Sequence, residues 1–197
     1  NPVTMIDLKT KKTSFVGKEL KHVKGKYYYL RKKLEKEKKL KQIKKMKHKE
    51  RRKVHQILHN ISKNIVQEAY DSKAMIVIGR LKHLPKNKGR RFNRKLSGFS
   101  YFTLTNFIEY KARQKGVPFM KVNEAYTSKT CAVCGSIGKR VKNWFQCECG
   151  YQDNADRNAA FNIGARGLSY MLGSGVHACA QKSIHEDKSI LEEWTST

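Results

Sequence analysis

The sequence is short of acidic side chains, of cysteine and of long apolar runs. Only 16 Asp and Glu accompany 43 Lys and Arg among the 197 residues, so the formal net charge is +27. No apolar run approaches the roughly 18 residues of a membrane-spanning helix, and no secretory signal peptide opens the chain. These absences argue against a membrane protein and against a secreted domain held by disulfides. They predict a cytoplasmic protein with one ordinary domain, or one domain with a small appendage.

The positive charge predicts the kind of partner. So large an excess favours a long anionic polymer, and nucleic acid is favoured over the competing interpretation, an anionic membrane surface. About half of the excess lies between Lys18 and Lys53, where 18 Lys and Arg face four Glu, a net charge of +14. Most charge runs are solvated faces, but this one is almost single-signed and repels itself unless phosphates neutralise it.

Four of the five cysteines lie in one short stretch, as two pairs that are each followed by glycine. Such pairs are typical of a zinc ribbon, in which four thiolates hold a structural Zn²⁺ and leave no open position for substrate. The second pair is one residue shorter than the usual spacing, so either its turn is tighter or Cys179 or His177 replaces one thiolate. Disulfides or unremarkable buried cysteines are the alternative. The predicted ligands are Cys131, Cys134, Cys147 and Cys149.

Hydrophobic spacing predicts helices and strands that alternate along the chain. Steps of three and four indicate a basic helical hairpin at about 18–71, with arms of about 18–44 and 49–71 separated by a break in phase around Met46. A continuous apolar run predicts a buried strand at 74–78. This order favours an α/β fold with a central mixed sheet. The other predicted elements are a hairpin of strands at 2–8 and 12–17, a basic loop at 80–95, a helix at 99–115, a strand at 117–122, a helix packed through small residues at about 155–171, and a loosely held tail from Gly173.

The motifs YTSKTCxxCG and FxCxCGYxDNADRNAAFNI resemble those of the TnpB/OrfB proteins of insertion sequences, relatives of the type V CRISPR effectors. Nearly the whole chain follows the family's order. The resemblance implies an RNA-guided DNA endonuclease, labelled a transposase, that binds guide RNA and target DNA in a prokaryotic cytoplasm at the nucleoid. It implies an RNase H-like (RuvC-like) mixed sheet with an inserted zinc ribbon. The implied domains are a first core part at 1–125, the ribbon at 126–152, the last core helix at 153–172 and a tail at 173–197.

Cleavage in such a nuclease needs three clustered carboxylates that hold two Mg²⁺ about 4 Å apart. The resemblance assigns the third acid to Asp156, whose alternative role is an N-cap, although Asp153 or Asn154 serves that role equally well. It assigns the first acid to a strand that precedes Asn1, so the isolated chain is expected not to cleave. Asp7 is a poor substitute.

The second acid of the family is expected after the strand at 74–78, where this chain has Gly79-Arg80-Leu81 instead of a glutamate. In one interpretation the protein has lost its nuclease and only binds nucleic acid, as a guided repressor or a decayed element. In the other, the acid has moved to Glu124, at the end of a strand expected to pair beside the first. An ordinary exposed loop glutamate is the alternative for Glu124.

The helical hairpin and the basic loop are expected to bind phosphates with little sequence preference of their own. The predicted nucleic-acid-binding residues are Lys32, Lys33, Arg51, Arg52, Arg90, Arg91 and Arg94. A weaker third hypothesis is a basic zinc protein that acts on ribosomal or other RNA, which leaves the ADRNAA helix unexplained.

Overall fold

The computed structural model describes residues 3–81 and 100–172 of the chain. The chain divides into two compact units, one built around the long helices and one that contains the four clustered cysteines and the last helix. Among the described helices, none combines the length and the apolarity needed to cross a membrane. Of the described residues, the first unit comprises Val3, Phe15–Ile76 and 100–119, and the second comprises Thr4–Ser14, 77–81 and 120–172.

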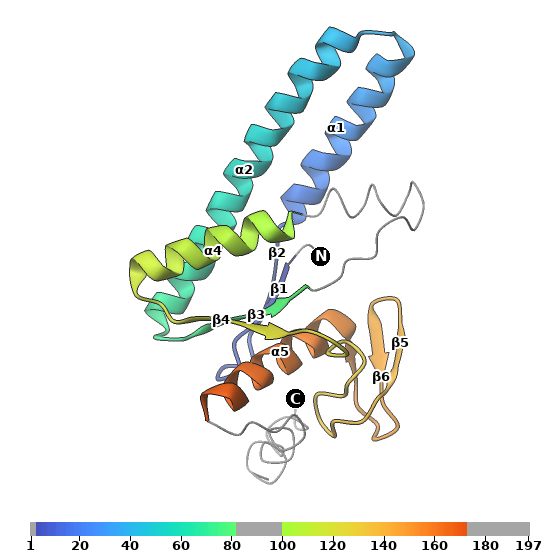
Figure 1. Ribbon diagram of the computed structural model, residues 1–197. Helices are drawn as coiled ribbons and strands as arrows, with labels where there is room; N and C mark the ends of the chain where they lie inside the picture. The colour runs from blue at the N-terminus through green and yellow to red at the C-terminus, as the bar shows by residue number, and fades with distance from the viewer. Residues whose placement is uncertain (1–2, 82–99, 173–197) are drawn as a thin grey trace. The chain divides into compact units, whose positions relative to one another are not determined.

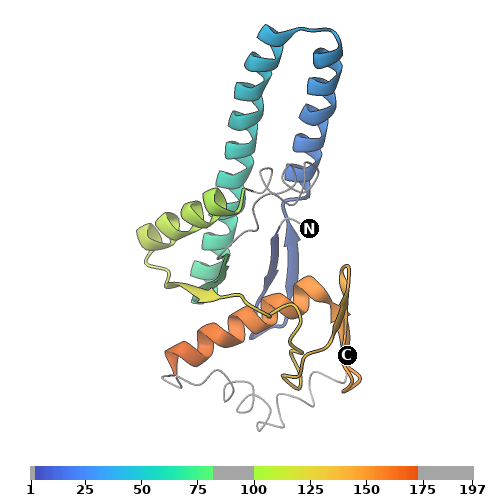
Figure 2. The same cartoon turned by 45° about the vertical axis from the view of Figure 1, so that its right-hand side comes forward.

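Helices α1 (Lys18–Lys36) and α2 (Leu40–Asp71) run side by side as the predicted hairpin (Figures 1 and 2). Apolar residues spaced three or four apart form one face of α2, and this face is buried. Its buried apolar residues are Val54, Ile57, Leu58, Ile65 and Val66. In α1 the buried residue is Leu20. The packed part of the hairpin therefore lies at the beginning of α1 and in the second half of α2.

The turn of the hairpin corrects the prediction of a break around Met46. Helix α2 continues through Met46, and the chain reverses just after α1. There Lys38 has a φ of 52°, and its N–H donates to the carbonyl of Glu35 at 3.1 Å. The N–H of Lys39 donates to the carbonyl of Leu34 at 3.0 Å, which completes the two-bond pattern that ends helices at a left-handed residue. A lysine takes the position where glycine is usual, so the composition gave no sign of this turn.

Helix α4 (Tyr101–Lys115) packs across α2 within the first unit. Ile108 and Ala112 are buried at this contact, and the Phe107 ring stacks on the imidazole of His59 at 4.0 Å between ring centroids. The helix ends at Gly116, whose φ of 69° is in the left-handed region. The predicted helix and its glycine stop are thus confirmed.

Among the described residues, the short strands form two pairs and one three-stranded sheet instead of one continuous sheet. Strands β1 (Val3–Ile6) and β2 (Thr13–Val16) form the predicted hairpin, and β3 (Ile76–Arg80) pairs with β4 (Phe119–Asn123). Both β3 and β4 begin two residues later than predicted, because apolar runs mark a strand's core better than its ends. The predicted central mixed sheet is not formed by these residues, since periodicity identifies strands but not their sheet partners. The predicted basic loop lies mostly outside the described residues, and its first residue, Arg80, is the last residue of β3. The predicted tail also lies outside the described residues.

The last part of the second unit that the structure describes is a small antiparallel sheet followed by α5 (Ala155–Met171), which has its predicted bounds. Its strands are β5 (Lys139–Val141), β6 (Trp144–Gln146) and β7 (Gln152–Asn154). Helix α5 approaches its neighbours through glycine: a Cβ on Gly167 would lie 2.5 Å from the Val77 side chain. One on Gly164 would lie 2.9 Å from Leu8. The packing of α5 on β3 and on the β1–β2 turn therefore favours glycine at these two positions, because any side chain would collide with the neighbouring residue unless that residue shifted.

Candidate functional site: a four-cysteine centre and two carboxylates

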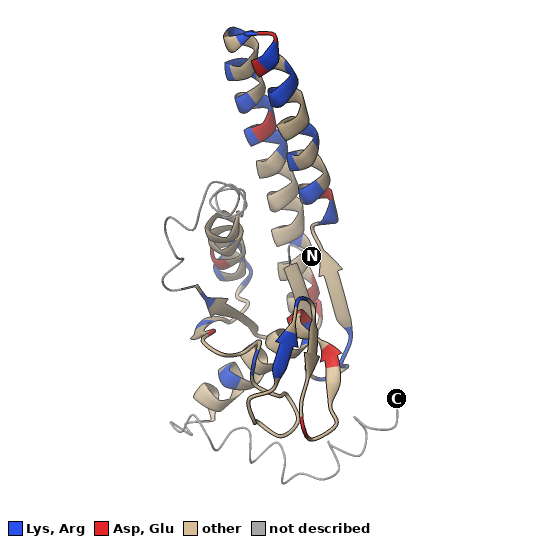
Figure 3. Cartoon of the chain, turned by 90° about the vertical axis from the view of Figure 1, so that its right-hand side faces the viewer, with Lys and Arg blue, Asp and Glu red and all other residues tan. Residues whose placement is uncertain are grey.

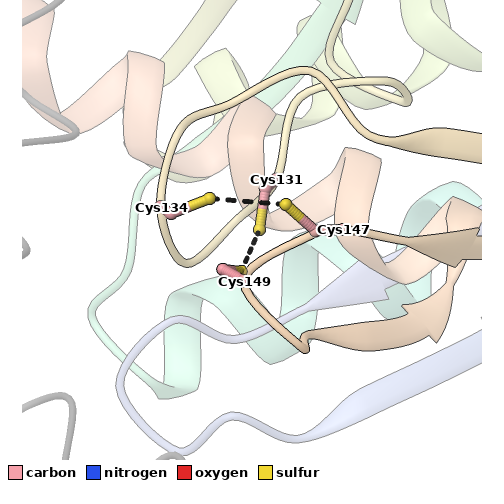
Figure 4. A group of neighbouring side chains, drawn as sticks. All are labelled: Cys131, Cys134, Cys147 and Cys149. Carbon is pink, nitrogen blue, oxygen red and sulfur yellow. Dashed lines mark hydrogen bonds between the residues drawn. The ribbon is translucent and has the colours of Figure 1, made fainter.

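The four predicted cysteines converge from two tight turns (Figure 4). Cys131 donates its N–H to the carbonyl of Ser136 at 2.8 Å, and the N–H of Gly135 returns to the carbonyl of Cys131 at 3.1 Å. In the second turn the N–H of Gly150 donates to the carbonyl of Cys147 at 3.2 Å. Both glycines have positive φ, 75° and 91°, which lets each turn close behind its sulfurs. The shorter second pair is thus accommodated by a tight turn.

The sulfur positions fit a single tetrahedral metal ion. All four Sγ atoms lie within 4.8 Å of one another. Cys131 and Cys149 are 3.7 Å apart, and Cys134 and Cys147 are 3.4 Å apart. A tetrahedral ion with metal–sulfur bonds of about 2.3 Å requires sulfurs about 3.8 Å apart. These separations are too long for disulfides, whose sulfurs are about 2 Å apart, and the four cysteines are free. The cluster can therefore hold one metal ion.

The alternative ligands named from the sequence, His177 and Cys179, lie outside the described residues. The four clustered sulfurs already provide a complete tetrahedral set. A replacement of one of these thiolates is therefore not needed to explain the site.

The protein environment divides the four thiols into two types. Cys131 and Cys147 are buried, and burial raises the pKa of both thiols. Cys134 is exposed, and although partial burial acts in the opposite sense, hydrogen bonds from Ser136 lower its pKa to about 6. A cation among the sulfurs would stabilise the buried thiolates, which are otherwise costly to ionise.

Asp156 lies in the first turn of α5, which directly follows β7. The N-cap is Asn154, whose side-chain oxygen accepts from the N–H of Asp156 at 2.9 Å and from that of Arg157 at 3.4 Å. The Asp156 carboxylate is therefore not used in capping. It accepts instead a hydrogen bond from Arg140 of β5 at 3.2 Å.

Glu124 directly follows β4, beside Gly79 of β3. A Cβ built on Gly79 would lie 2.9 Å from the Glu124 Cβ and 3.0 Å from its Oε2. It would also lie 2.9 Å from the Cδ1 atom of Ile163 on α5. Burial raises the pKa of Glu124, as expected for a carboxyl group withdrawn from water. The predicted pairing of the two strands is confirmed, and the glutamate is not a freely solvated loop residue.

The predicted phosphate-binding residues lie on both arms of the hairpin where they are described. Lys32 and Lys33 are exposed on α1, and Arg51 and Arg52 are exposed on α2. Figure 3 shows lysine and arginine along both helices with few acids between them. The two arginines line an open cleft together with His48 and His55. Arg90, Arg91 and Arg94 lie outside the described residues.

Three residues of this region were not predicted from the sequence: Arg140, Asn158 and Asn162. The asparagines are four apart in a helix, a spacing that places both on one face, so their position was available as a signal. Arg140 pairs with Asp156, sixteen positions further along the chain. The sequence alone does not show that the chain folds back to bring these two residues together.

Comparison with known proteins places this site in a family. Residues 101–163 match the family model described as the Cas12f1-like TNB domain. The chain is 37% identical over 92 residues to a CRISPR-associated endodeoxyribonuclease Cas12f1 of Sulfoacidibacillus thermotolerans, covering 45% of this chain and 21% of that protein. It is 33% identical over 119 residues to a TnpB-like protein of Methanocaldococcus jannaschii, covering 58% and 43%.

A solved structure agrees with these sequence matches. The chain superposes on a Cas12f1–sgRNA–target DNA complex, determined by cryo-electron microscopy, with a TM-score of 0.63 and 29% identity over 77% of this chain and 43% of that chain. The fold is thus a mixed helix-and-strand arrangement like that of a Cas12f1 nuclease chain. These sequence and structure matches support assignment of the chain to the TnpB/OrfB family. It spans about a fifth to just under half of the length of these relatives.

Proposed function

We propose that the chain is part of an RNA-guided, metal-dependent DNA endonuclease that acts at the nucleoid of a prokaryotic cell. Its core has the RuvC-like form of the RNase H fold, with residues 1–125 as its first part and 153–172 as its last helix. Residues 126–152 are an inserted zinc ribbon, and 173–197 form a tail. The family, the similarity to a guide-bound nuclease chain and the positive charge of the hairpin all support this assignment.

The contact between Gly79 and Glu124 is the observation that carries the proposal. The Cβ of a glutamate at position 79 would lie 2.9 Å from the Glu124 Cβ and 3.0 Å from its Oε2, so one of the two side chains would have to shift. Glycine at this position leaves the space that Glu124 enters from the neighbouring strand. This contact supports the proposal that Glu124, at the end of β4, takes the role that a glutamate on β3 has in the family.

Asp156 is the second carboxylate of the proposed site. Asn154 accepts from two of the orphan N–H groups at the start of α5, so the Asp156 carboxylate is not needed as a cap. In the described structure one of its oxygens accepts from Arg140. A two-metal site needs one more carboxylate than these two. Mg²⁺ held by such acids would activate a water and stabilise the leaving oxygen of the phosphodiester. Glu124 and Asp156 supply the hard oxygen ligands that Mg²⁺ prefers.

The cysteine centre has a structural role in this proposal, with Zn²⁺ as its ion. Its four sulfurs have the separations of a closed tetrahedral site, which has no position left for substrate. The exposed lysines and arginines of α1 and α2, with Arg90, Arg91 and Arg94, bind phosphates of guide RNA and of the RNA–DNA hybrid. Base pairing with the guide selects the target.

The test uses the full-length protein with guide RNA, target DNA and Mg²⁺. Glu124→Gln should abolish cleavage and leave target binding unchanged, whereas Glu148→Gln, which changes an exposed glutamate between two cysteines, should cleave normally. The exchange of positions, Gly79→Glu combined with Glu124→Gly, should restore cleavage to part of the original rate. Cleavage that survives Glu124→Gln eliminates this residue as a metal ligand.

The second candidate is a nucleic-acid-binding protein that does not cleave. The pairing of Arg140 with Asp156 favours it, since an arginine beside a carboxylate opposes a bound cation. Arg140→Gln separates the two candidates in the same assay. In a nuclease the variant should need less Mg²⁺ for half-maximal cleavage, and in a binding protein neither form should cleave at any Mg²⁺ concentration.

A further inference from the structure

Two asparagines in α5 are buried although neither is a proposed ligand. Asn158 is 0% exposed and Asn162 is 3% exposed. Burying an amide is costly unless its donors and acceptor are satisfied. Their position one turn apart directs both side chains towards the segment that enters the first cysteine turn.

The two amides form a closed set of hydrogen bonds with two backbone carbonyls. Asn158 Nδ2 donates to the carbonyl of Thr130 at 2.7 Å and to that of Thr127 at 3.4 Å. Asn162 Nδ2 donates to the same carbonyls, at 2.8 Å and 2.9 Å respectively. Each carbonyl oxygen thus accepts from both asparagines, which uses both of its lone pairs.

Asn158 also accepts, so its side chain brackets Cys131. Its Oδ1 accepts the N–H of Ala132 at 2.9 Å, while its Nδ2 binds the carbonyl of Thr130. The residues directly before and after the buried cysteine are therefore held by one side chain of α5. Any movement of the backbone at Cys131 strains these bonds.

The same network reaches both proposed catalytic acids. Asp156 is two residues before Asn158 in the first turn of α5. On the other side, Thr127 donates its N–H at 3.2 Å and its hydroxyl at 2.9 Å to the backbone carbonyl of Glu124. A continuous path of hydrogen bonds thus links Glu124, the Cys131 turn and the helix that carries Asp156.

We propose that Asn158 and Asn162 are positioning residues that make the placement of Asp156 and Glu124 depend on a metal ion at the four cysteines. The ion fixes the Cys131 turn, the turn fixes the carbonyls of Thr127 and Thr130, and the asparagines fix α5 against them. Loss of the ion releases the turn, and the first turns of α5 loosen with it. The coupling itself does not require the proposed function. Only the catalytic role of the two acids rests on it.

Hydrogen exchange of backbone amides, read by mass spectrometry on the full chain, tests the coupling. In the unchanged protein, chelation of the metal should raise exchange of residues 156–162 by about tenfold or more, the scale of removing one buried hydrogen bond. In metal-loaded Asn158→Leu, these amides should already exchange at the fast rate. Co²⁺ substitution should still give thiolate charge-transfer absorption, which shows that the cysteine centre remains loaded.

The response to metal separates positioning from a merely structural role. A purely structural asparagine would lower protection equally with and without metal, so addition of metal would still slow exchange in the Asn158→Leu helix. Under the proposal, metal slows exchange at the Cys131 turn but no longer at 156–162. Either a preserved metal response in α5 or unchanged exchange in the loaded variant overturns the coupling.

Two controls keep the test decisive. Exchange around Leu58 in α2, in the other unit, reports whether the variant has unfolded as a whole. If Asn158→Leu does unfold, Asn162→Leu replaces it, because this change leaves the bond to Ala132 and both bonds of Asn158 in place. Its metal response should fall by a smaller factor, and a full response overturns the proposal. These exchange readings do not depend on cleavage, so a failed nuclease assay with intact coupling refutes only the proposed function.

Discussion

The outer part of the helical hairpin and the cysteine module (residues 126–154) are stabilised in opposite ways. Between Lys21 and Lys53 no residue is buried, and a salt bridge from Arg31 to Glu50 links the two arms. In the cysteine module, Cys131 and Phe145 are wholly buried, and turns, glycines and buried amides fix the backbone. The outer part of the hairpin is expected to act through its total positive charge, whereas the fold of the cysteine module depends on individual side-chain contacts.

This difference indicates where substitutions matter. Exchanging one lysine of the hairpin for another polar residue changes the charge by a small fraction and disturbs little packing. Exchanging a single residue of the cysteine module or of the helix behind it removes a ligand, a hydrogen bond or a necessary space. A single substitution should therefore usually be tolerated in the hairpin but should often disrupt the cysteine module.

Loss of the metal should give the largest contrast. Cys131→Ser should abolish high-affinity metal binding and disorder the module, because structural zinc sites contribute apparent free energies of about 10–16 kcal/mol in small domains. The unit with α2 and α4 should stay folded, as measured by exchange around Leu58. Metal content and Co²⁺ absorption are the measurements. Cys179→Ser is the matched control and should keep one ion per chain, whereas loss of metal from this variant would assign a ligand role to the fifth cysteine.

Two glycine substitutions should change stability in opposite directions. Gly167→Ala should destabilise the second unit by about 1–3 kcal/mol, because the added methyl would lie 2.5 Å from Val77. Gly25→Ala in α1 meets no atom within 4 Å, so it should stabilise that helix by about 0.5–1 kcal/mol. Denaturant unfolding of each variant measures both effects. A destabilising Gly25→Ala would show that the hairpin is more tightly packed than its exposure indicates.

Charge removal from the hairpin should weaken nucleic-acid binding without changing its sequence preference. Arg51→Gln with Arg52→Gln should lower the slope of log affinity against log salt by about 0.9 for each duplex phosphate that the variant no longer neutralises. Titrations with two unrelated sequences at several salt concentrations measure this slope. The exposed neighbour Gln56→Ala is the control and should leave the slope unchanged. Weakening confined to one of the two sequences would contradict phosphate binding by these arginines.

The smallest contrast concerns single polar contacts. Tyr151→Phe removes a 2.7 Å hydrogen bond to Asp153 and should cost about 1.5 kcal/mol, since the acceptor is charged. Glu109→Gln removes an exposed pair with Arg113 in α4 and should cost less than about 0.5 kcal/mol. Thermal unfolding of both variants compares them. Equal losses would mean that polar contacts contribute alike in both units.

The sequence predicted features that depend on local patterns. The bounds of α5, the glycine stop of α4 and the first hairpin of strands all follow from caps, periodicity and turn residues close to them in the chain. The convergence of four cysteines follows from spacing that permits few geometries. The turn at Lys38 was missed because a lysine occupies a left-handed position.

Features that depend on distant contacts were not available from the sequence. The asparagine network joins residues about thirty positions apart, and its carbonyl partners leave no trace in residue identity. Whether the strand pairs join into one central sheet likewise depends on tertiary packing. The roles of Glu124 and Asp156, and of the basic residues, remain predictions that the experiments above address.

The closeness of Gly79 and Glu124 also bears on how inactive relatives are recognised. A survey that checks one alignment column for an acid would discard this chain as degenerate. Scoring the two strand positions jointly, with glycine in one column and glutamate in the other as an allowed combination, would distinguish an exchanged carboxylate from a vanished one. Such a rule applies wherever side chains from two adjacent strands can reach the same metal site.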